Sequence, residues 1–396
     1  MTQPTTSRRA LLGAAAALPL AAPAIAQAAP IRVGLVVVLT GPQASLGTQM
    51  RDGWALGMRH LNNQFGGRAV ETIVIDDELR PDVAVTKVRA ALERDRVDVV
   101  AGVVFSNILA AIMRPVTEAN TFLISANAGP STFAGRGCSP FFFCASYNND
   151  QVHAATGQAA QDAGHRRVFL LTPNYQAGRD AFAGFKSRFR GEVVDEVFVP
   201  LTQLDFSAEL ARIASLRPDA VFTFMPGGLG VNLVRQYRQA GLANIPFLSS
   251  FTVDESTLPA QGEAALGFQS GTNWTPDLPN EPNRRFVEDF VREFSYVPAS
   301  YAAHAYDTAR LLDSAVRRVA GNLGDKNAMR AALAAAEFQS LRGAFRFGAN
   351  QFPVQDFYLA RVGRRPDGRF QTEMQRRVME ANVDPWAGEC RMPARI

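Results

Sequence analysis

Two short polar segments carry side chains that could hold an anion. Ser106 and Asn107 form one segment, and Ser125, Ala126 and Asn127 form the other. Their hydroxyl, amide and backbone N–H groups can donate hydrogen bonds to a carboxylate without any catalytic step. A serine in such a turn is more often a helix cap than a nucleophile, and no motif links a histidine to either segment. We therefore predict that these segments bind the carboxylate of a small molecule and that the chain is not an enzyme.

Both segments follow apolar runs that are too short to be helices. The β-branched run 97–104 precedes a helical pattern over 108–118, and a second apolar run covers 121–124. Ser106 or Asn107 would cap the helix between the two runs. Strand, helix and strand in this order predict parallel strands whose carboxyl ends meet at one sheet edge, which is where open α/β sheets bind ligands. We expect the two polar turns to lie side by side at this edge.

The same alternation recurs along most of the chain. Apolar strands alternate with helical patterns from 31 to 145, and the alternation restarts from 150 to 272. This predicts an α/β fold with mainly parallel sheets that helices cover on both faces. Helical patterns after 283 and the strands 345–347 and 356–362 are too few for a third sheet. We expect them to return to the first two blocks, so that chain crossings hold two lobes at a hinge with a cleft between them.

The composition is that of a globular protein, and the N-terminal segment predicts export. The chain has 396 residues, of which 47% are hydrophobic, and a formal net charge of +4 with acidic and basic residues interleaved. No nucleic-acid partner is predicted from this charge pattern. Residues 1–28 combine Arg8-Arg9, an Ala/Leu-rich segment and small residues near the end, which predicts a signal peptide resembling the twin-arginine type and a periplasmic location. No later segment is apolar over about 18 residues, so we expect no stable membrane insertion.

Three cysteines remain in the exported part of the chain, where a disulfide can persist. Cys138 could pair with Cys144, which would close a small loop, or with Cys390, which would tie the tail to the body. The four histidines lie far from each other and from the cysteines in the sequence, so no metal site is predicted. The dinucleotide-binding and Walker patterns are missing, and we predict no cofactor.

Aromatic and apolar residues at other predicted strand ends could form the wall of the cleft. Tyr175 follows a strand of the second block, where a tyrosine can present both ring and hydroxyl to a ligand. Phe224, Met225 and Phe251 also lie at strand ends, and they could equally belong to the core of a lobe. Trp274 lies at a predicted crossing between the blocks, where it would support the hinge or contact the ligand. The candidate binding residues also include Ser45, Phe105 and Tyr147.

Several of these segments together resemble the periplasmic leucine/isoleucine/valine-binding protein family of ABC transporters. The likeness covers nearly the whole mature chain. It implies a type I periplasmic binding fold with two lobes, 29–146 plus 275–352 and 147–274 plus 353–396, joined by three crossovers. Such a protein captures a solute and delivers it to a membrane permease. The segments that carry the likeness are Thr40-Gly41-Pro42, Ser45-Leu46-Gly47, Ser106-Asn107, Ser125-Ala126-Asn127-Ala128, Tyr175-Gln176-Ala177-Gly178, Phe345-Arg346-Phe347 and Gln355-Asp356.

The resemblance also implies roles for single positions. In amino-acid-binding relatives the positions of Ser106 and 125–127 bind the α-carboxylate, and the position of Tyr175 lines the pocket from the other lobe. The acidic residue that pairs with the ligand ammonium in those relatives is absent here, because Asp254 and Glu255 are displaced further along the chain. Burying an ammonium without a carboxylate partner is costly. We therefore expect a small aromatic carboxylate as ligand, either benzoate-like or phenylpropanoid.

The tail adds a second resemblance. Segments 385–390 and 138–140 are similar to the subgroup that takes up benzoate-like and phenylpropanoid acids, which implies a Cys138–Cys390 disulfide and a free Cys144. Within the same family, a branched-chain amino acid or an amide is the alternative ligand. From another class, the alternative is a secreted serine hydrolase that uses Ser45, Ser106 or Ser125.

Overall fold

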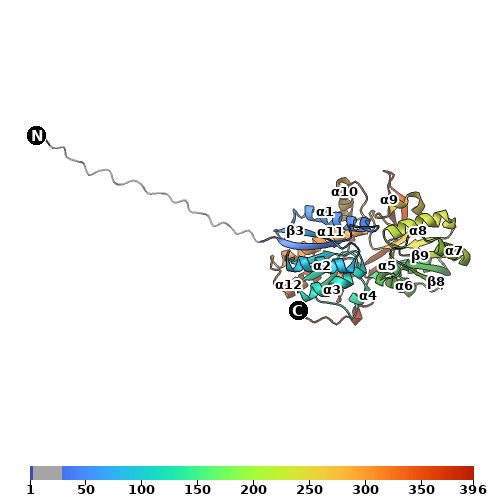
Figure 1. Ribbon diagram of the computed structural model, residues 1–396, viewed down its shortest axis with the longest axis horizontal. Coiled ribbons are helices and arrows are strands. Elements are labelled where there is room, and N and C mark those ends of the chain that lie inside the picture. The colour runs from blue at the N-terminus through green and yellow to red at the C-terminus, as the bar shows by residue number, and fades with distance from the viewer. Residues whose placement is uncertain (3–28) are drawn as a thin grey trace.

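The molecule consists of two α/β lobes that lie side by side (Figure 1). This computed structural model describes residues 1–2 and 29–396, so the signal peptide predicted over 1–28, with its arginine pair, lies outside the described residues. Within the described part of the chain, no helix has the length and apolar character needed to cross a membrane.

The first lobe is built on a six-stranded sheet with the order β2-β3-β1-β4-β5-β6. All neighbouring strands run parallel except β2 and β3. Strands with helices on both faces are apolar throughout, which explains the short continuous apolar runs in the sequence. The strands are β1 (Ile31–Val37), β2 (Gln64–Phe65), β3 (Arg68–Asp76), β4 (Val99–Gly102), β5 (Phe122–Ser125) and β6 (Phe142–Cys144).

The second lobe is built on an eight-stranded sheet with the order β12-β13-β11-β10-β9-β7-β8, and β14 also pairs with β13. Strands β7 to β11 run parallel, whereas β13 is antiparallel to each of its partners. The predicted α/β fold with two mainly parallel sheets is thereby confirmed. The strands are β7 (Arg167–Pro173), β8 (Glu192–Val199), β9 (Ala220–Thr223), β10 (Phe247–Ser249), β11 (Gln269–Thr272), β12 (Arg346–Phe347), β13 (Pro353–Arg364) and β14 (Phe370–Asn382).

Helices cover both sheets. In the first lobe, α1 and α11 can pack closely because Gly53 has no side chain; a Cβ there would collide with the carbonyl oxygen of Ala302. The first-lobe helices are α1 (Ala44–His60), α2 (Pro81–Glu93), α3 (Ser106–Glu118), α4 (Ser131–Ala134), α10 (Glu281–Phe294), α11 (Ser300–Arg318) and α12 (Lys326–Ala335). The second-lobe helices are α5 (Asn149–Asp162), α6 (Gln176–Arg188), α7 (Ser207–Leu216), α8 (Gly228–Gln239) and α9 (Leu258–Gln261).

The segments that connect the lobes converge on one backbone carbonyl. The oxygen of Ser146 accepts hydrogen bonds from Asn273 Nδ2 at 3.0 Å, Arg342 Nη1 at 2.8 Å and Gln355 Nε2 at 2.6 Å. Arg342 also forms an ion pair with Asp307 at 3.1 Å, and both of these side chains are buried. Because the acceptor and its donors come from distant parts of the chain, this cluster holds the connecting segments together as a hinge.

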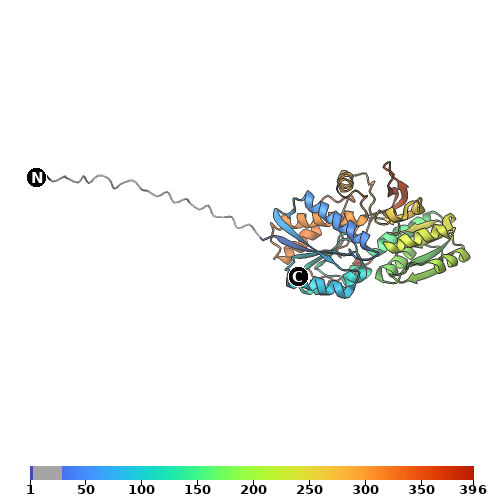
Figure 2. The same cartoon turned by 45° about the horizontal axis from the view of Figure 1, so that its top comes forward.

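The tail returns to the first lobe after β14. A disulfide joins Cys390 to Cys138, whose Cα atoms are 5.7 Å apart, and Cys144 stays free and buried. Further along, Arg330 Nη1 in α12 donates to the carbonyl oxygen of Pro393 at 2.7 Å. The C terminus therefore lies beside the first lobe (Figure 2).

Candidate functional site

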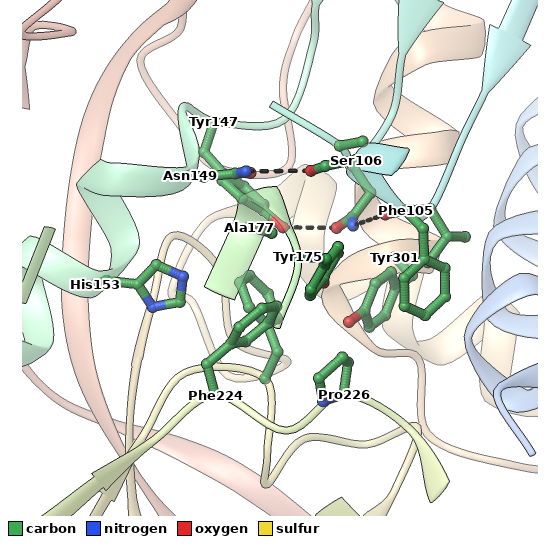
Figure 3. Close-up of a pocket in the computed structure, with 14 residues that line it drawn as sticks. Phe105, Ser106, Tyr147, Asn149, His153, Tyr175, Ala177, Phe224, Pro226 and Tyr301 are labelled. Carbon is green, nitrogen blue, oxygen red and sulfur yellow. Dashed lines mark hydrogen bonds between the residues drawn. The ribbon is translucent and has the colours of Figure 1, made fainter. Parts of the chain in front are cut away.

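A narrow cavity lies between the two lobes, at the carboxyl ends of strands from both sheets (Figure 3). Its volume is about 20 Å³, inside about 350 Å³ of space between the lining atoms. A cavity of this size holds little more than one water molecule, so a ring-sized ligand requires the lobes or the lining rings to move apart. The cavity is lined by Val104, Phe105, Ser106, Asn127, Ala128, Tyr147, Asn149, His153, Tyr175, Ala177, Phe224, Pro226, Phe251 and Tyr301.

The turn between β4 and α3 forms one end of the cavity. Helix α3 begins at Ser106, and its N-cap residue is Phe105, which makes no side-chain capping bond. The expected cap by Ser106 or Asn107 is therefore wrong, because both residues already lie in the first helical turn. The first N–H groups of a helix have no partner within the helix and attract anions. Ser106 Oγ accepts a hydrogen bond from Asn149 Nδ2 at 3.2 Å, which leaves the Ser106 hydroxyl proton free to donate.

The turn after β5 lies beside the turn between β4 and α3, as predicted. Its side chains, however, already make hydrogen bonds within the protein. Ser125 Oγ donates to the carbonyl oxygen of Ala128 at 2.6 Å and is fully buried. Asn127 Nδ2 donates to the carbonyl oxygen of Val104 at 2.7 Å, and Asn127 Oδ1 accepts from the Tyr147 hydroxyl at 2.8 Å. These bonds fix the two turns and the Tyr147 ring relative to one another. In this arrangement the side chains of Ser125 and Asn127 stabilise the site, and they are not free to bind an anion.

Aromatic rings from both lobes form the rest of the wall. Tyr175, the N-cap of α6, stacks on Phe224 with ring centroids 6.2 Å apart and contacts Phe105 of the first lobe at 6.2 Å. Phe251 stacks on Tyr147 at 5.2 Å. The backbone of Phe251 is left-handed, with φ of 58°, which is unusual for a bulky residue and occurs mainly where a site holds its residues in a fixed position.

Six of the predicted residues lie outside the cavity lining. Ser45 is exposed at the start of α1, and Asn107 lies in the first turn of α3. Met225 belongs to the core of the second lobe. Trp274 is buried in a separate cluster, where its Nε1 donates to Asn283 Oδ1 at 2.7 Å. Ser125 and Ala126 are also buried outside the lining.

Seven other lining residues were not among the predicted ones. Asn149 and His153 lie on α5, which the sequence did not predict as a helix. Tyr301 lies at the start of α11, within a predicted helix, but nothing in the sequence indicated which way its ring faces. The remaining four are Val104, Ala128, Ala177 and Pro226, each next to a predicted residue or within a predicted turn.

The lining of the cavity carries no formal charge. It contains no Asp, Glu, Lys or Arg among the described residues, and burial lowers the pKa of His153 to about 3, so its ring is neutral. Burial raises the pKa of Tyr175 and of Tyr301, so both phenols stay protonated. An anion in this cavity would be held by N–H and O–H donors alone.

The two displaced acids are buried near this region but outside the lining. Asp254 Oδ1 accepts from the Ser256 N–H at 2.8 Å, and its Oδ2 has no hydrogen-bond partner among the described residues. Burial raises the pKa of Asp254 to about 6. Glu255 Oε1 accepts from the N–H and the hydroxyl of Thr372, each at 2.7 Å, and burial raises the pKa of Glu255 to about 8.

Direct hydrogen bonds join the lobes around the cavity. Asp180 of α6 accepts from Ser131 of α4 through Oγ at 2.8 Å and through N–H at 3.2 Å. The N–H of Gly228 donates to the carbonyl oxygen of Pro42 at 3.2 Å. The lobes are therefore closed on one another in this structure.

The comparisons with known proteins agree on one family. A family model described as periplasmic binding protein matches residues 30–369. The chain is 28% identical over 391 residues to Leu/Ile/Val-binding protein homolog 6 of Brucella melitensis, covering 96% of this chain and 98% of that protein. A solute binding protein of an ABC transporter from R. palustris, solved in complex with benzoate, has a TM-score of 0.86 and 31% identity, covering 91% and 99% of the two chains. A solute binding protein of an ABC transporter from Rhodopseudomonas palustris BisB5, in complex with 3,4-dihydroxy benzoic acid, has a TM-score of 0.83 and 29% identity, covering 90% and 99%.

Proposed function

The chain belongs to the periplasmic binding protein family, and on that premise we propose that it is the receptor of an ABC transporter for a small aromatic carboxylate. The ligand would be benzoate-like or phenylpropanoid, and a membrane permease would accept it from the closed protein. The observation that carries this proposal is the cavity between the lobes, with hydrogen-bond donors at one end, aromatic rings around it and no charged side chain.

The donor end suits a carboxylate. Helix α3 begins at the cavity, where Phe105 and Ser106 are part of the lining, and the partial positive charge of a helix N-terminus favours an anion there. Uncharged donors in a closed site can hold a carboxylate because each hydrogen bond to a charged group is stronger than a neutral one. The N-terminus of α6, which begins next to Tyr175, adds a second set of N–H groups on the opposite lobe.

The rest of the lining suits a ring better than an ammonium. Phe105, Tyr175, Phe224 and Phe251 offer apolar faces to a planar ligand. No lining residue is acidic, and an ammonium buried without a carboxylate partner would cost several kcal/mol. This is the reason for preferring an aromatic acid to an amino acid.

Closure of the lobes completes the proposed function. The predicted lobes, 29–146 plus 275–352 and 147–274 plus 353–396, would rotate about the hinge at Ser146 to admit the ligand, except that the end of the tail would stay with the first lobe, to which Cys390 is joined. A ligand shifts this equilibrium only through contacts that are better in the closed state. Because Phe105 and Tyr175 face each other from different lobes, a ring bound between them makes such contacts.

Two matched pairs of ligands test the proposal by calorimetry and thermal shift. Benzoate and benzamide have nearly the same shape and differ in charge, and 3-phenylpropionate and phenylalanine differ by one ammonium group. We expect each aromatic carboxylate to bind and to raise the melting temperature, and its partner to bind at least about tenfold more weakly. Binding of leucine, isoleucine and valine without any response to the aromatic acids would refute the ligand class and leave the family assignment intact.

The amino-acid alternative has one observation in its favour. Asp254 is buried, and one of its carboxylate oxygens has no partner in the described part of the chain; a rearranged pocket could bring this oxygen to a ligand ammonium. Asp254→Asn would then abolish amino-acid binding, whereas it should leave benzoate binding unchanged under our proposal. Turnover of an ester by the purified protein, lost in Ser106→Ala, would instead favour the hydrolase alternative.

A further inference from the structure

His153 is a buried, neutral histidine that faces the cavity without a hydrogen-bond partner. It lies one turn into α5, is 2% exposed, and forms part of the cavity lining. Figure 3 shows its ring extending from α5 toward the centre of the site. Among the described residues neither ring nitrogen makes a hydrogen bond, and Nδ1 is fully enclosed.

The surroundings of His153 explain why its ring stays neutral. Its edge contacts Phe224 with centroids 5.0 Å apart and Phe222 at 5.9 Å. No charged group of the described residues shifts the pKa of His153, and burial alone lowers it to about 3. An imidazole in this apolar setting has lost its hydrogen bonds to water, and such unpaired polar groups are rare in native proteins and usually have a functional reason.

Several other polar side chains of the lining, unlike His153, do have hydrogen-bond partners. Asn127, Tyr147 and Asn149 all have partners within the protein. The hydroxyls of Tyr175 and Tyr301, like His153, have none among the described residues. The cavity thus contains one group of polar side chains that hold the structure together and a second group that is left for a ligand.

His153 lies one helical turn along α5 from the proposed carboxylate site. Ser106, at the N-terminus of α3 in the first lobe, accepts a hydrogen bond from Asn149 of α5. His153 lies on the same helix, one turn or about 5.4 Å beyond Asn149, and beside Phe224 of the second lobe (Figure 3). In a benzoate the substituent at the para position points directly away from the carboxylate. A benzoate anchored at Ser106 would therefore direct its para substituent toward His153.

We propose that His153 selects aromatic carboxylates that carry a hydroxyl group on the side of the ring remote from the carboxylate. This inference rests on the proposed function and names the ligand class more closely. A neutral imidazole offers one donor and one acceptor, and a hydroxyl group can serve either, so the pairing works with both tautomers of the ring. A methyl group of the same size leaves His153 unpaired, and a second carboxylate or an ammonium finds no countercharge in the lining.

Calorimetry with benzoate, 4-hydroxybenzoate, 4-methylbenzoate and terephthalate tests this inference. We expect 4-hydroxybenzoate to bind about tenfold or more tightly than 4-methylbenzoate, and terephthalate not to bind. In His153→Leu the ratio of the Kd values for 4-methylbenzoate and 4-hydroxybenzoate should fall to about one, and this ratio is insensitive to a general change in affinity. His165→Leu, a histidine outside the cavity, is the matched control and should keep the preference of the wild type.

The outcomes separate the two proposals. If the benzoates bind without any preference for the hydroxyl, or if His153→Leu keeps the preference, the role of His153 is refuted and the proposed function stands. If no aromatic carboxylate binds, the proposed function fails and the role of His153 fails with it.

A measurement without a variant covers the case in which His153→Leu does not fold. In the ¹⁵N-histidine NMR spectrum of the wild type, the signal of one buried imidazole should shift on addition of 4-hydroxybenzoate and shift much less with 4-methylbenzoate. Equal shifts with both ligands would overturn the inference. Tyr175→Phe and Tyr301→Phe should each leave the histidine response in place, since they remove different hydroxyls.

Discussion

Ser131→Ala should weaken ligand binding without a matching loss of stability. Ser131 Oγ donates to Asp180 Oδ1 at 2.8 Å, and this bond joins α4 of the first lobe to α6 of the second. Asp180 is only 3% exposed, so the bond to its carboxylate is largely shielded from water. A hydrogen bond to a charged group contributes about 1.5 kcal/mol or more, and Ser131→Ala removes it only from the closed state. The ratio of closed to open molecules should fall about tenfold, and the measured Kd for benzoate should rise by the same factor.

Gln176→Ala provides the matched control. Gln176 Nε2 donates to the same oxygen, Asp180 Oδ1, also at 2.8 Å, but both residues lie on α6. Its loss should therefore lower the free energy of unfolding in urea and leave the Kd within about twofold, because the bond exists in both open and closed states. The reasoning is wrong if calorimetry gives the same Kd for Ser131→Ala as for the wild type, or if the two variants weaken binding equally.

Three further predictions concern the anion site, a buried acid and the tail. Ser106→Ala should raise the Kd for benzoate about tenfold in calorimetry and change that for benzamide much less, since the hydroxyl donates to a charge only in benzoate; an equal effect on both ligands would contradict the anion site. Burial raises the pKa of Glu255 from 4.5 to about 8, so the unfolded chain releases a proton that the native state keeps, and stability should fall as the pH rises through this range. Glu255→Gln keeps a hydrogen-bond acceptor for Thr372. It should reduce the loss of unfolding free energy between pH 5 and pH 8, measured by urea unfolding. If that loss is unchanged in the variant, other groups cause it. The double change of Cys138 and Cys390 to serine should lower the free energy of unfolding by about 2–5 kcal/mol, and an unchanged midpoint in urea would refute a stabilising role for the bond.

The sequence predicted most of the fold because its short apolar runs and helical patterns mark buried parallel strands and amphipathic helices. Helix α5 was not predicted because its sequence, Asn149–Asp162, has no apolar stripe. Most of its residues are Ala, Gln or Asp, and the helix is buried on nearly all sides. Burial of this kind comes from tertiary packing, which periodicity does not detect. Asn149 and His153 were missed together with the helix.

Prediction of the site was limited by the direction of side chains at strand ends. Phe224 and Met225 are neighbours after β9, and successive side chains of extended backbone point to opposite faces. Phe224 lines the cavity, whereas Met225 lies in the core of the second lobe. The sequence locates such a pair without telling which member faces the ligand. Hydrogen bonds were equally hard to predict. The Ser125 hydroxyl donates to the carbonyl oxygen of Ala128, and residue type alone does not indicate this local contact.

The position of Cys144 has a consequence for oxidative folding after export. Cys138 is only six positions from Cys144 along the chain, whereas its native partner Cys390 is 252 positions away. Strand β6 buries the Cys144 thiol completely and directs it to the carbonyl oxygen of Tyr147 at 3.1 Å. Once the first sheet has folded, the wrong thiol is buried, and Cys138 stays available for Cys390.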